Sequence, residues 1–163
     1  DLGGWRRQDV ALGSWAMEGA GTLLWTLGVQ AALPAYHEPL NMEQALKPLM
    51  RDEGAEEIIG GARLRPVGDL QRARAESALF LWRSRQEITR RKSGMASMDA
   101  DMARAVEAEV QRAAQSRTFQ SHNGKDLLAG RTPVSSLDPR SLNLLLATSQ
   151  AREDALRFAC NDR

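Results

Sequence analysis

The sequence has little of several residue types on which common folds and active sites depend. Its 163 residues include one cysteine, two histidines and one tyrosine, and aromatic residues make up 5% of the chain. A single cysteine excludes an intramolecular disulfide, which favours a reducing cytoplasm as the location. His37, His122 and Cys160 are too scattered for the short ligand spacing of a zinc site. We therefore expect neither a metal nor a cofactor.

The chain also lacks an excess of charge of one sign. It has 22 Lys and Arg against 21 Asp and Glu, for a net charge of +1. This balance argues against nucleic acid or an anionic membrane as the partner. One stretch, residues 14–34, approaches the length of a membrane helix, but Glu18, three glycines and Pro34 interrupt it. We interpret it as a buried core helix, and we find no signal peptide.

Helical periodicity accounts for most of the remaining sequence, and no segment shows a convincing strand pattern. Beyond the core helix, the sequence predicts a short helix over 41–51, an acidic turn over 52–57, a long helix over 69–92, an amphipathic helix over 99–117, a loop over 118–137 and a last helix from Asp138-Pro139 to about Asn161. The prediction is a single all-α domain over 1–163, a helical bundle around a buried, Trp-containing central helix. We expect four aromatic residues in its core: Trp15, Trp25, Trp82 and Phe158.

Several charged residues fall where the helical pattern predicts burial. On a helical wheel of 69–92, six charged residues share one face, which we expect to be solvated: Asp69, Arg72, Glu76, Arg83, Glu87 and Arg90. Arg74 and Arg85 instead fall within the apolar arc, so we expect both to point inward. Arg152 lies opposite the polar face of the last helix. Glu18 is the one carboxylate of the core helix.

These charges leave three interpretations open. A buried charge without a partner is costly, so we expect Glu18 to meet Arg74, Arg85 or Arg152. In the first interpretation the pair is structural and fixes helix register. In the second, the surplus guanidinium groups line a pocket for a carboxylate or phosphate. In the third, the helical phase differs and the arginines reach out to water.

Three sequence blocks carry a family resemblance. They are Trp15-x-x-Glu18 with Leu23-Leu-Trp-Thr-Leu-Gly28 and Leu33-Pro34; Ala62-Arg-Leu-Arg-Pro66 with Leu81-Trp-Arg-Ser-Arg85; and Gly130-Arg131 with Ser136-Leu-Asp-Pro139 and Arg152-x-x-Ala155-Leu156-x-Phe158. Through these blocks, residues 14–160 resemble the bacterial domain-of-unknown-function family 4272 (DUF4272). The resemblance places Glu18, Arg65, Arg85 and Arg152 on signature positions and implies no reaction, cofactor or catalytic residue. It also implies that an N-terminal segment of the native domain is missing here.

The sequence thus predicts a non-enzymatic cytoplasmic protein that recognises a protein partner or a small anionic ligand. The candidate site consists of Glu18, Arg65, Arg74, Arg85 and Arg152, with no catalytic residue assigned. One alternative is an enzyme that uses Glu18 as acid or base. A second is nucleic-acid binding through the basic segment 63–92. An exposed apolar patch near 118–137, or near Met98 and Met102, would instead indicate a protein partner.

Overall fold

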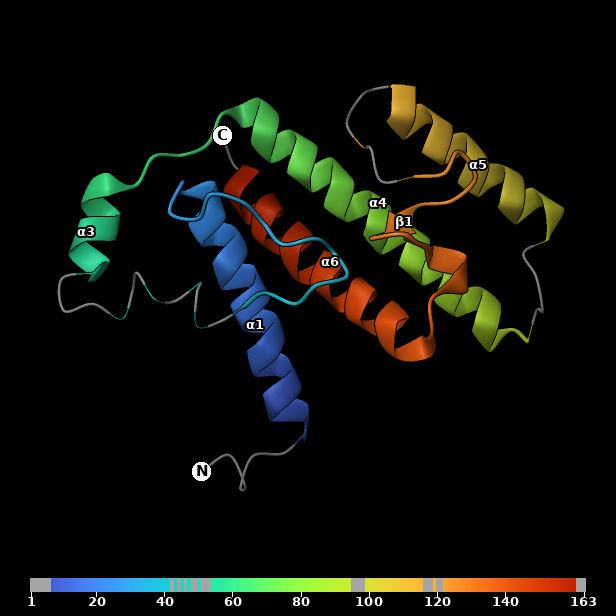
Figure 1. Cartoon of the computed structure of the whole chain (residues 1–163), viewed down its shortest axis with the longest axis horizontal. Helices are drawn as coiled ribbons and strands as arrows, with labels where there is room; N and C mark the ends of the chain where they lie inside the picture. Colours follow the sequence, from blue (N-terminus) through green and yellow to red (C-terminus); the bar gives the residue numbers. More distant parts are fainter. Residues whose placement is uncertain are drawn as a thin grey trace.

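The computed structural model describes residues 7–41, 43, 45, 47, 50, 54–94, 99–115, 119 and 122–160. Within them the chain is mostly helical (Figure 1). The helices are α1 (Arg7–Thr26), α3 (Gly54–Gly61), α4 (Val67–Lys92), α5 (Ala100–Gln115) and α6 (Pro139–Cys160). A small antiparallel pair of strands, β1 (Leu128–Ala129) and β2 (Thr132–Pro133), and a 3-10 turn, η2 (Val134–Ser136), lie between α5 and α6. The prediction of an all-α helical bundle is confirmed.

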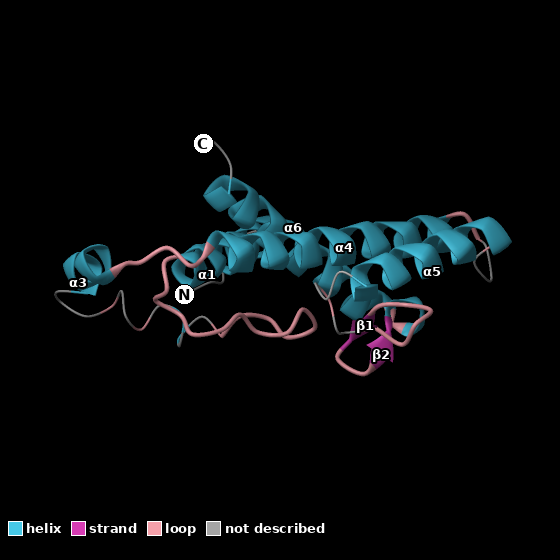
Figure 2. Cartoon of the chain, turned by 90° about the horizontal axis from the view of Figure 1, so that it is seen from above, coloured by secondary structure: helices cyan, strands magenta, loops and turns pink. Residues whose placement is uncertain are grey.

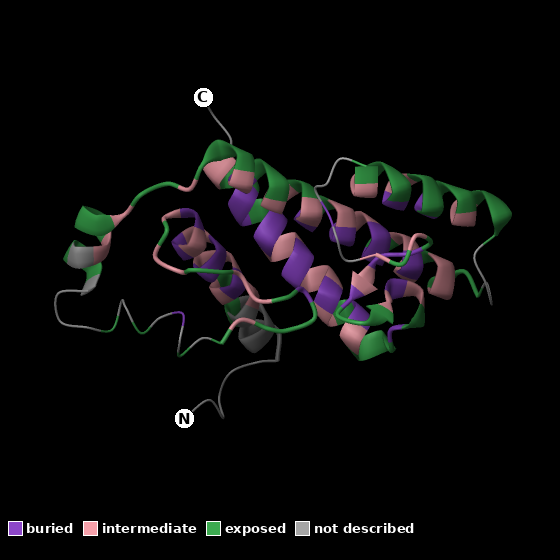
Figure 3. Cartoon of the chain, turned by 45° about the horizontal axis from the view of Figure 1, so that its top comes forward, coloured by how far each residue is buried: buried purple, intermediate pink, exposed green. Residues whose placement is uncertain are grey.

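Helix α6, rather than the helix of residues 14–34, lies in the middle of the bundle. Figure 1 shows α6 between α1 and α4, and α6 packs against both. Seen from above in Figure 2, α1, α6, α4 and α5 form one layer, with the β1–β2 hairpin on one of its faces. Figure 3 shows buried positions along the length of α6. The central position predicted for 14–34 is therefore wrong, because the partners on both sides of α6 could not be seen in the sequence.

Helix α1 also ends earlier than predicted, at Thr26 instead of near Pro34. Gly28 has φ of +74°, a left-handed conformation that glycine adopts readily. The segment before α4 lies along this helix end. The Arg63 N–H donates to the Leu27 carbonyl at 3.0 Å, and the Arg65 N–H donates to the Thr26 carbonyl at 2.9 Å. A tertiary contact thus satisfies the terminal carbonyl groups that a longer helix would have used.

The hydrophobic core lies where α4, α5, α6 and the 119–137 segment meet. Its fully buried members include Leu127, Val134 and Leu145, each 0% exposed. The aromatic rings of Tyr36, Phe80 and Phe119 follow one another, with centroid distances of 4.6 Å and 5.2 Å. The described part of 119–137 therefore contributes core residues, rather than the exposed apolar patch considered for it.

The core aromatic residues are only partly those predicted. Trp15, Trp25 and Trp82 are half-buried, and Trp82 packs against the core. Phe158 is 77% exposed, so its assignment to the core is wrong. It stands beside Arg157 on the solvent side of α6, whereas Ala155 and Leu156 point inward.

The remaining element boundaries follow local sequence signals to different degrees. Helices α5 and α6 match their predicted ranges closely, and Asp138 caps α6 by accepting hydrogen bonds from the Arg140 and Ser141 amides at 2.9 Å and 3.0 Å. The turn predicted over the acidic segment 52–57 is wrong for residues 54–57, because α3 begins at Gly54, and residues 52 and 53 lie outside the described residues. The helix predicted over 41–51 lies largely outside the described residues, as does Met98. No helix in the described part is long and apolar enough to cross a membrane.

Candidate functional site

Glu18 and Arg152 form a buried ion pair between α1 and α6. Arg152 is 1% exposed and Glu18 is 5% exposed. The Arg152 Nε donates to Glu18 Oε1 at 2.7 Å, and Nη2 lies 2.7 Å from the same oxygen without the alignment of a hydrogen bond. Glu18 Oε2 accepts the Leu40 amide at 3.0 Å. Both carboxylate oxygens are therefore occupied.

Arg152 also fixes the chain that follows α1. Its Nη1 donates to the Pro34 carbonyl at 2.7 Å, and its guanidinium group lies 4.6 Å from the centre of the Tyr36 ring. The Tyr36 hydroxyl lies 2.6 Å from Ser77 Oγ on α4. Burial raises the pKa of Tyr36, and the nearby charge of Glu76 raises it further. The tyrosine is thus a neutral hydrogen-bonding group that joins the 31–40 segment to α4.

Arg65 lies against the C-terminal end of α1. Its Nε donates to the Trp25 carbonyl at 2.8 Å, and its Nη2 donates to Gln30 and Ala31 at 2.6 Å and 2.9 Å. The guanidinium group is 4.6 Å from the centre of the Trp25 ring. A cation at this end also opposes the partial negative charge of the helix terminus. Among the described residues, no partner is found for Nη1.

A cleft of about 430 Å³ opens beside these groups. Its polar and aromatic lining comes from the end of α1, the loop after it, α4 and α6: Trp25, Tyr36, Arg65, Asp69, Arg72, Glu76 and Arg152. Leu33 and Pro34 complete one wall. Arg72 pairs with Asp69 at 3.1 Å on the exposed rim. The cleft thus combines two aromatic rings with three guanidinium groups and two carboxylates.

Glu76 is one of the two acids of this cleft, and the sequence predicted only a solvated position for it. It is half-buried on α4, and burial raises the pKa of its carboxyl although the positive charge of Arg152 partly opposes this. It accepts no hydrogen bond and forms no ion pair with any residue that the structure describes. A helical wheel of α4 could not reveal that Glu76 lines a cleft, because the opposite wall of the cleft comes from residues 31–36.

Arg74 and Arg85 do not join Glu18. Arg74 Nε lies 3.9 Å from Glu153 Oε1, and Arg85 Nη2 donates to Gln150 Oε1 at 2.5 Å. The Arg74 side chain is 38% exposed, and Arg85 is exposed. Their predicted inward orientation is therefore wrong: both reach from the apolar arc of α4 to polar groups along the α4–α6 seam, as long side chains can.

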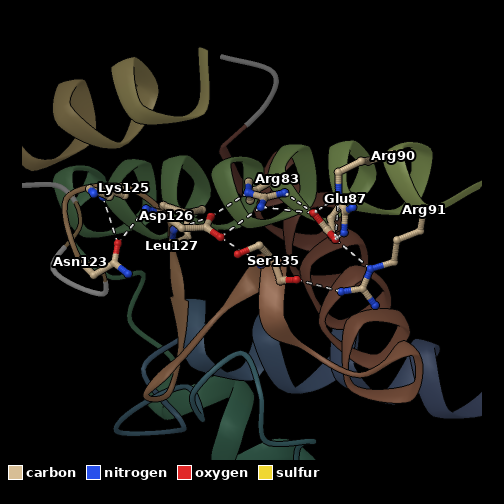
Figure 4. Close-up of polar contacts among 9 residues, drawn as sticks. All are labelled: Arg83, Glu87, Arg90, Arg91, Asn123, Lys125, Asp126, Leu127 and Ser135. Atoms are coloured by element: carbon tan, nitrogen blue, oxygen red, sulfur yellow. Dashed lines mark hydrogen bonds and ion pairs between the residues drawn. The ribbon is translucent and has the colours of Figure 1, made fainter. Parts of the chain in front are cut away.

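A second charge cluster lies where the sequence predicted solvent (Figure 4). Arg83 and Glu87 are 0% exposed. Arg83 donates to both carboxylate oxygens of Asp126, at 2.7 Å and 3.0 Å, and to Glu87 Oε2 at 3.3 Å. Arg90 and Arg91 donate to Glu87 Oε1, Arg91 at 2.8 Å. The solvated face predicted for α4 is therefore wrong over its C-terminal half, because the 122–137 segment covers it.

This cluster attaches the hairpin segment to α4. Asp126 also accepts the Leu127 and Ser135 amides, each at 2.9 Å, and Arg91 donates to the Leu137 carbonyl at 2.7 Å. Burial alone would raise the pKa of Glu87, but hydrogen bonds from Arg90 and Arg91 and the charge of Arg83 leave it lowered. We interpret the cluster as structural, since its buried acids and arginines neutralise one another.

No group of three or more His, Cys, Asp or Glu side chains within the described residues could hold a metal ion.

The chain was compared with protein families, with curated proteins and with solved structures. The model of a family described as a domain of unknown function, DUF4272, matches residues 3–105. This range contains the first two sequence blocks, with Glu18, Arg65 and Arg85, but not Arg152. No curated protein and no solved structure matches the chain. Since the family model covers more than half of the sequence, the chain belongs to the DUF4272 family.

Proposed function

We propose that this protein is a non-enzymatic binding protein that takes a small anionic ligand in the cleft lined by Arg65. The observation that carries the proposal is the set of contacts made by the Arg65 guanidinium group. Three carbonyl groups and the Trp25 ring hold its guanidinium group in place, while Nη1 has no partner among the described residues. A fixed cation with spare donors suits the planar geometry of a carboxylate or phosphate.

The shape of the cleft also supports a small ligand. Its volume of about 430 Å³ falls within the range of small-molecule sites, and Trp25 and Tyr36 offer apolar surface beside the charges. Arg72 on the rim adds a second guanidinium group, which its exposed partner Asp69 only partly neutralises.

The alternatives considered from the sequence have less support. An enzyme that uses Glu18 as acid or base would need a carboxylate oxygen free for substrate, yet Arg152 and the Leu40 amide occupy both. Nucleic-acid binding through 63–92 would need an exposed stripe of cations. Three of that segment's arginines, Arg83, Arg90 and Arg91, instead bind Glu87.

The test is a thermal-shift titration with phosphate, citrate, acetate and nucleotides. A ligand that binds the folded state raises the Tm with concentration. We expect at least one of these anions to do so in the wild type and in Arg63→Lys. The Arg63 guanidinium group is exposed and, among the described residues, bonds to the Gly60 and Ala62 carbonyls. Arg65→Lys and Arg72→Gln should both reduce the shift. Equal shifts in all four proteins would refute anion binding at this cleft. So would a wild type that responds neither to these anions nor to a ligand whose carboxylate has a positive charge beside it.

A further inference from the structure

The cleft of the proposed function presents one cation and one acid that no described residue neutralises directly. Arg72 is paired with Asp69, and Arg152 is paired with Glu18. Among the described residues, Arg65 Nη1 has no partner, and the Glu76 carboxylate takes neither a hydrogen bond nor an ion pair. Two opposite charges therefore remain for a ligand in the same cleft.

These two charges decide which ligands fit. A plain anion would gain Arg65 but would meet the negative charge of Glu76, and a plain cation would gain Glu76 but would meet Arg65 and Arg152. A ligand with a carboxylate and an amine meets a favourable partner for each. We propose, on the basis of the proposed function, that the cleft binds a small zwitterion of the amino-acid class, with its carboxylate at Arg65 and its amine at Glu76.

The guanidinium group of Arg65 is held in place before a ligand arrives, and the backbone of Glu76 lies in the packed helix α4. The carbonyl groups at the end of α1 fix Arg65. Glu76 lies on α4 next to Ser77, whose hydroxyl bonds to Tyr36. Because the two groups come from different elements that are already packed together, binding requires little ordering of the site.

The surroundings of Glu76 also indicate which amino acids to test first. Glu76 lines a second hollow, an apolar groove of about 720 Å³ between α4 and α5 whose walls include Leu79, Trp82 and Phe119. An amine at Glu76 places the neighbouring side chain of the ligand near this groove. A side chain such as that of leucine would find apolar surface there.

The experiment is calorimetric titration of the wild type with a panel of the common amino acids, beginning with leucine. The amino acid that binds most tightly is then compared with its N-acetyl derivative, which lacks the positive charge, and with its amide, which lacks the negative charge. Removing either charge from the ligand should weaken binding about tenfold or more, as expected for the loss of a charge-assisted hydrogen bond.

The variant Glu76→Gln separates a zwitterion from a plain anion by the sign of its effect. It should weaken binding of the amino acid and strengthen binding of the N-acetyl derivative, because the same negative charge attracts one and repels the other. Glu107→Gln is the control: Glu107 is an exposed acid on α5 that lines neither the cleft nor the apolar groove. It should leave both affinities unchanged.

Two results would overturn the zwitterion while leaving anion binding intact. One is an N-acetyl derivative that binds at least as tightly as the amino acid, and the other is a Glu76→Gln variant that strengthens both. A wild type that binds no amino acid in the panel, yet responds to phosphate or acetate through Arg65, would also overturn it. If it responds to neither class of ligand, the proposed function fails as well.

Discussion

Arg83 on α4 donates two parallel hydrogen bonds to Asp126 in the hairpin segment, from Nε to Oδ1 at 2.7 Å and from Nη2 to Oδ2 at 3.0 Å. The two residues are 43 positions apart in the sequence, and both are buried. Asp126 in turn holds the Leu127 and Ser135 amides. This buried pair therefore attaches the hairpin segment to the helical layer.

Removing this attachment should be costly. Arg83→Met leaves Asp126 and Glu87 buried without their shared partner, so we expect a loss of about 3–5 kcal/mol in the free energy of unfolding, measured by urea denaturation. Arg104→Met removes an exposed arginine that pairs with Asp101 on α5, and it should change stability by less than about 1 kcal/mol. Equal effects of the two substitutions would contradict the structural role of the buried pair.

The sequence was sufficient to predict most helices, but not which face of each helix is buried by other segments. Periodicity and the Asp138-Pro139 start signal were sufficient for α4, α5 and α6, because those signals are local. A helical wheel gives the direction of Arg83 around α4 but cannot show that residues 122–137 lie over it. For Arg74 and Arg85, side-chain length decided the outcome, since each extends from the apolar arc to polar groups on α6.

The ion-pair geometry predicts a large loss of stability for one arginine and a small loss for another, although the sequence predicted an inward position for both. Arg152→Met strands the buried carboxylate of Glu18 and should cost about 3–5 kcal/mol. Arg85→Met removes an exposed side chain bonded to Gln150 and should cost less than about 1 kcal/mol. Urea denaturation of both variants checks the difference. A large loss from Arg85→Met would mean that Arg85 lies inward after all.

The end of α1 can be tested with two glycines. At Gly28 the backbone has φ of +74°, and an added Cβ would lie 3.0 Å from the Arg63 carbonyl oxygen. Gly28→Ala should therefore destabilise the protein by about 1–2 kcal/mol. Gly13 is an exposed residue within α1 with open space around its Cβ position, so Gly13→Ala should stabilise it by about 0.5–1 kcal/mol. Thermal unfolding of both variants would reveal effects of opposite sign, and two equal losses would contradict this helix boundary.

Acid should weaken the second charge cluster through Glu87. The pKa of Glu87 is lowered from its ordinary value of 4.5, so at acidic pH the unfolded chain binds a proton that the folded chain does not. The stability from this group is present above pH 4.5 and is lost as the pH falls through the lower folded pKa. In Glu87→Gln this part of the acid dependence should be absent. Urea denaturation across acidic pH measures it, and an unchanged dependence would contradict the shift.

Glu76 should show the reverse dependence, because burial raises its pKa above 4.5. The folded chain then holds a proton that the unfolded chain has lost, so stability falls as the pH rises from 4.5 through the folded pKa. Glu76→Gln removes a half-buried charge that has no direct partner among the described residues, and it should raise stability near neutral pH by roughly 1 kcal/mol. Glu109→Gln, beside Arg112, should not. A gain confined to Glu76→Gln would mean that the fold tolerates this carboxylate at a loss of stability, as expected of a group kept for binding. A loss of stability would instead show that Glu76 has a structural partner, and the acid of the cleft would then be unavailable to a ligand.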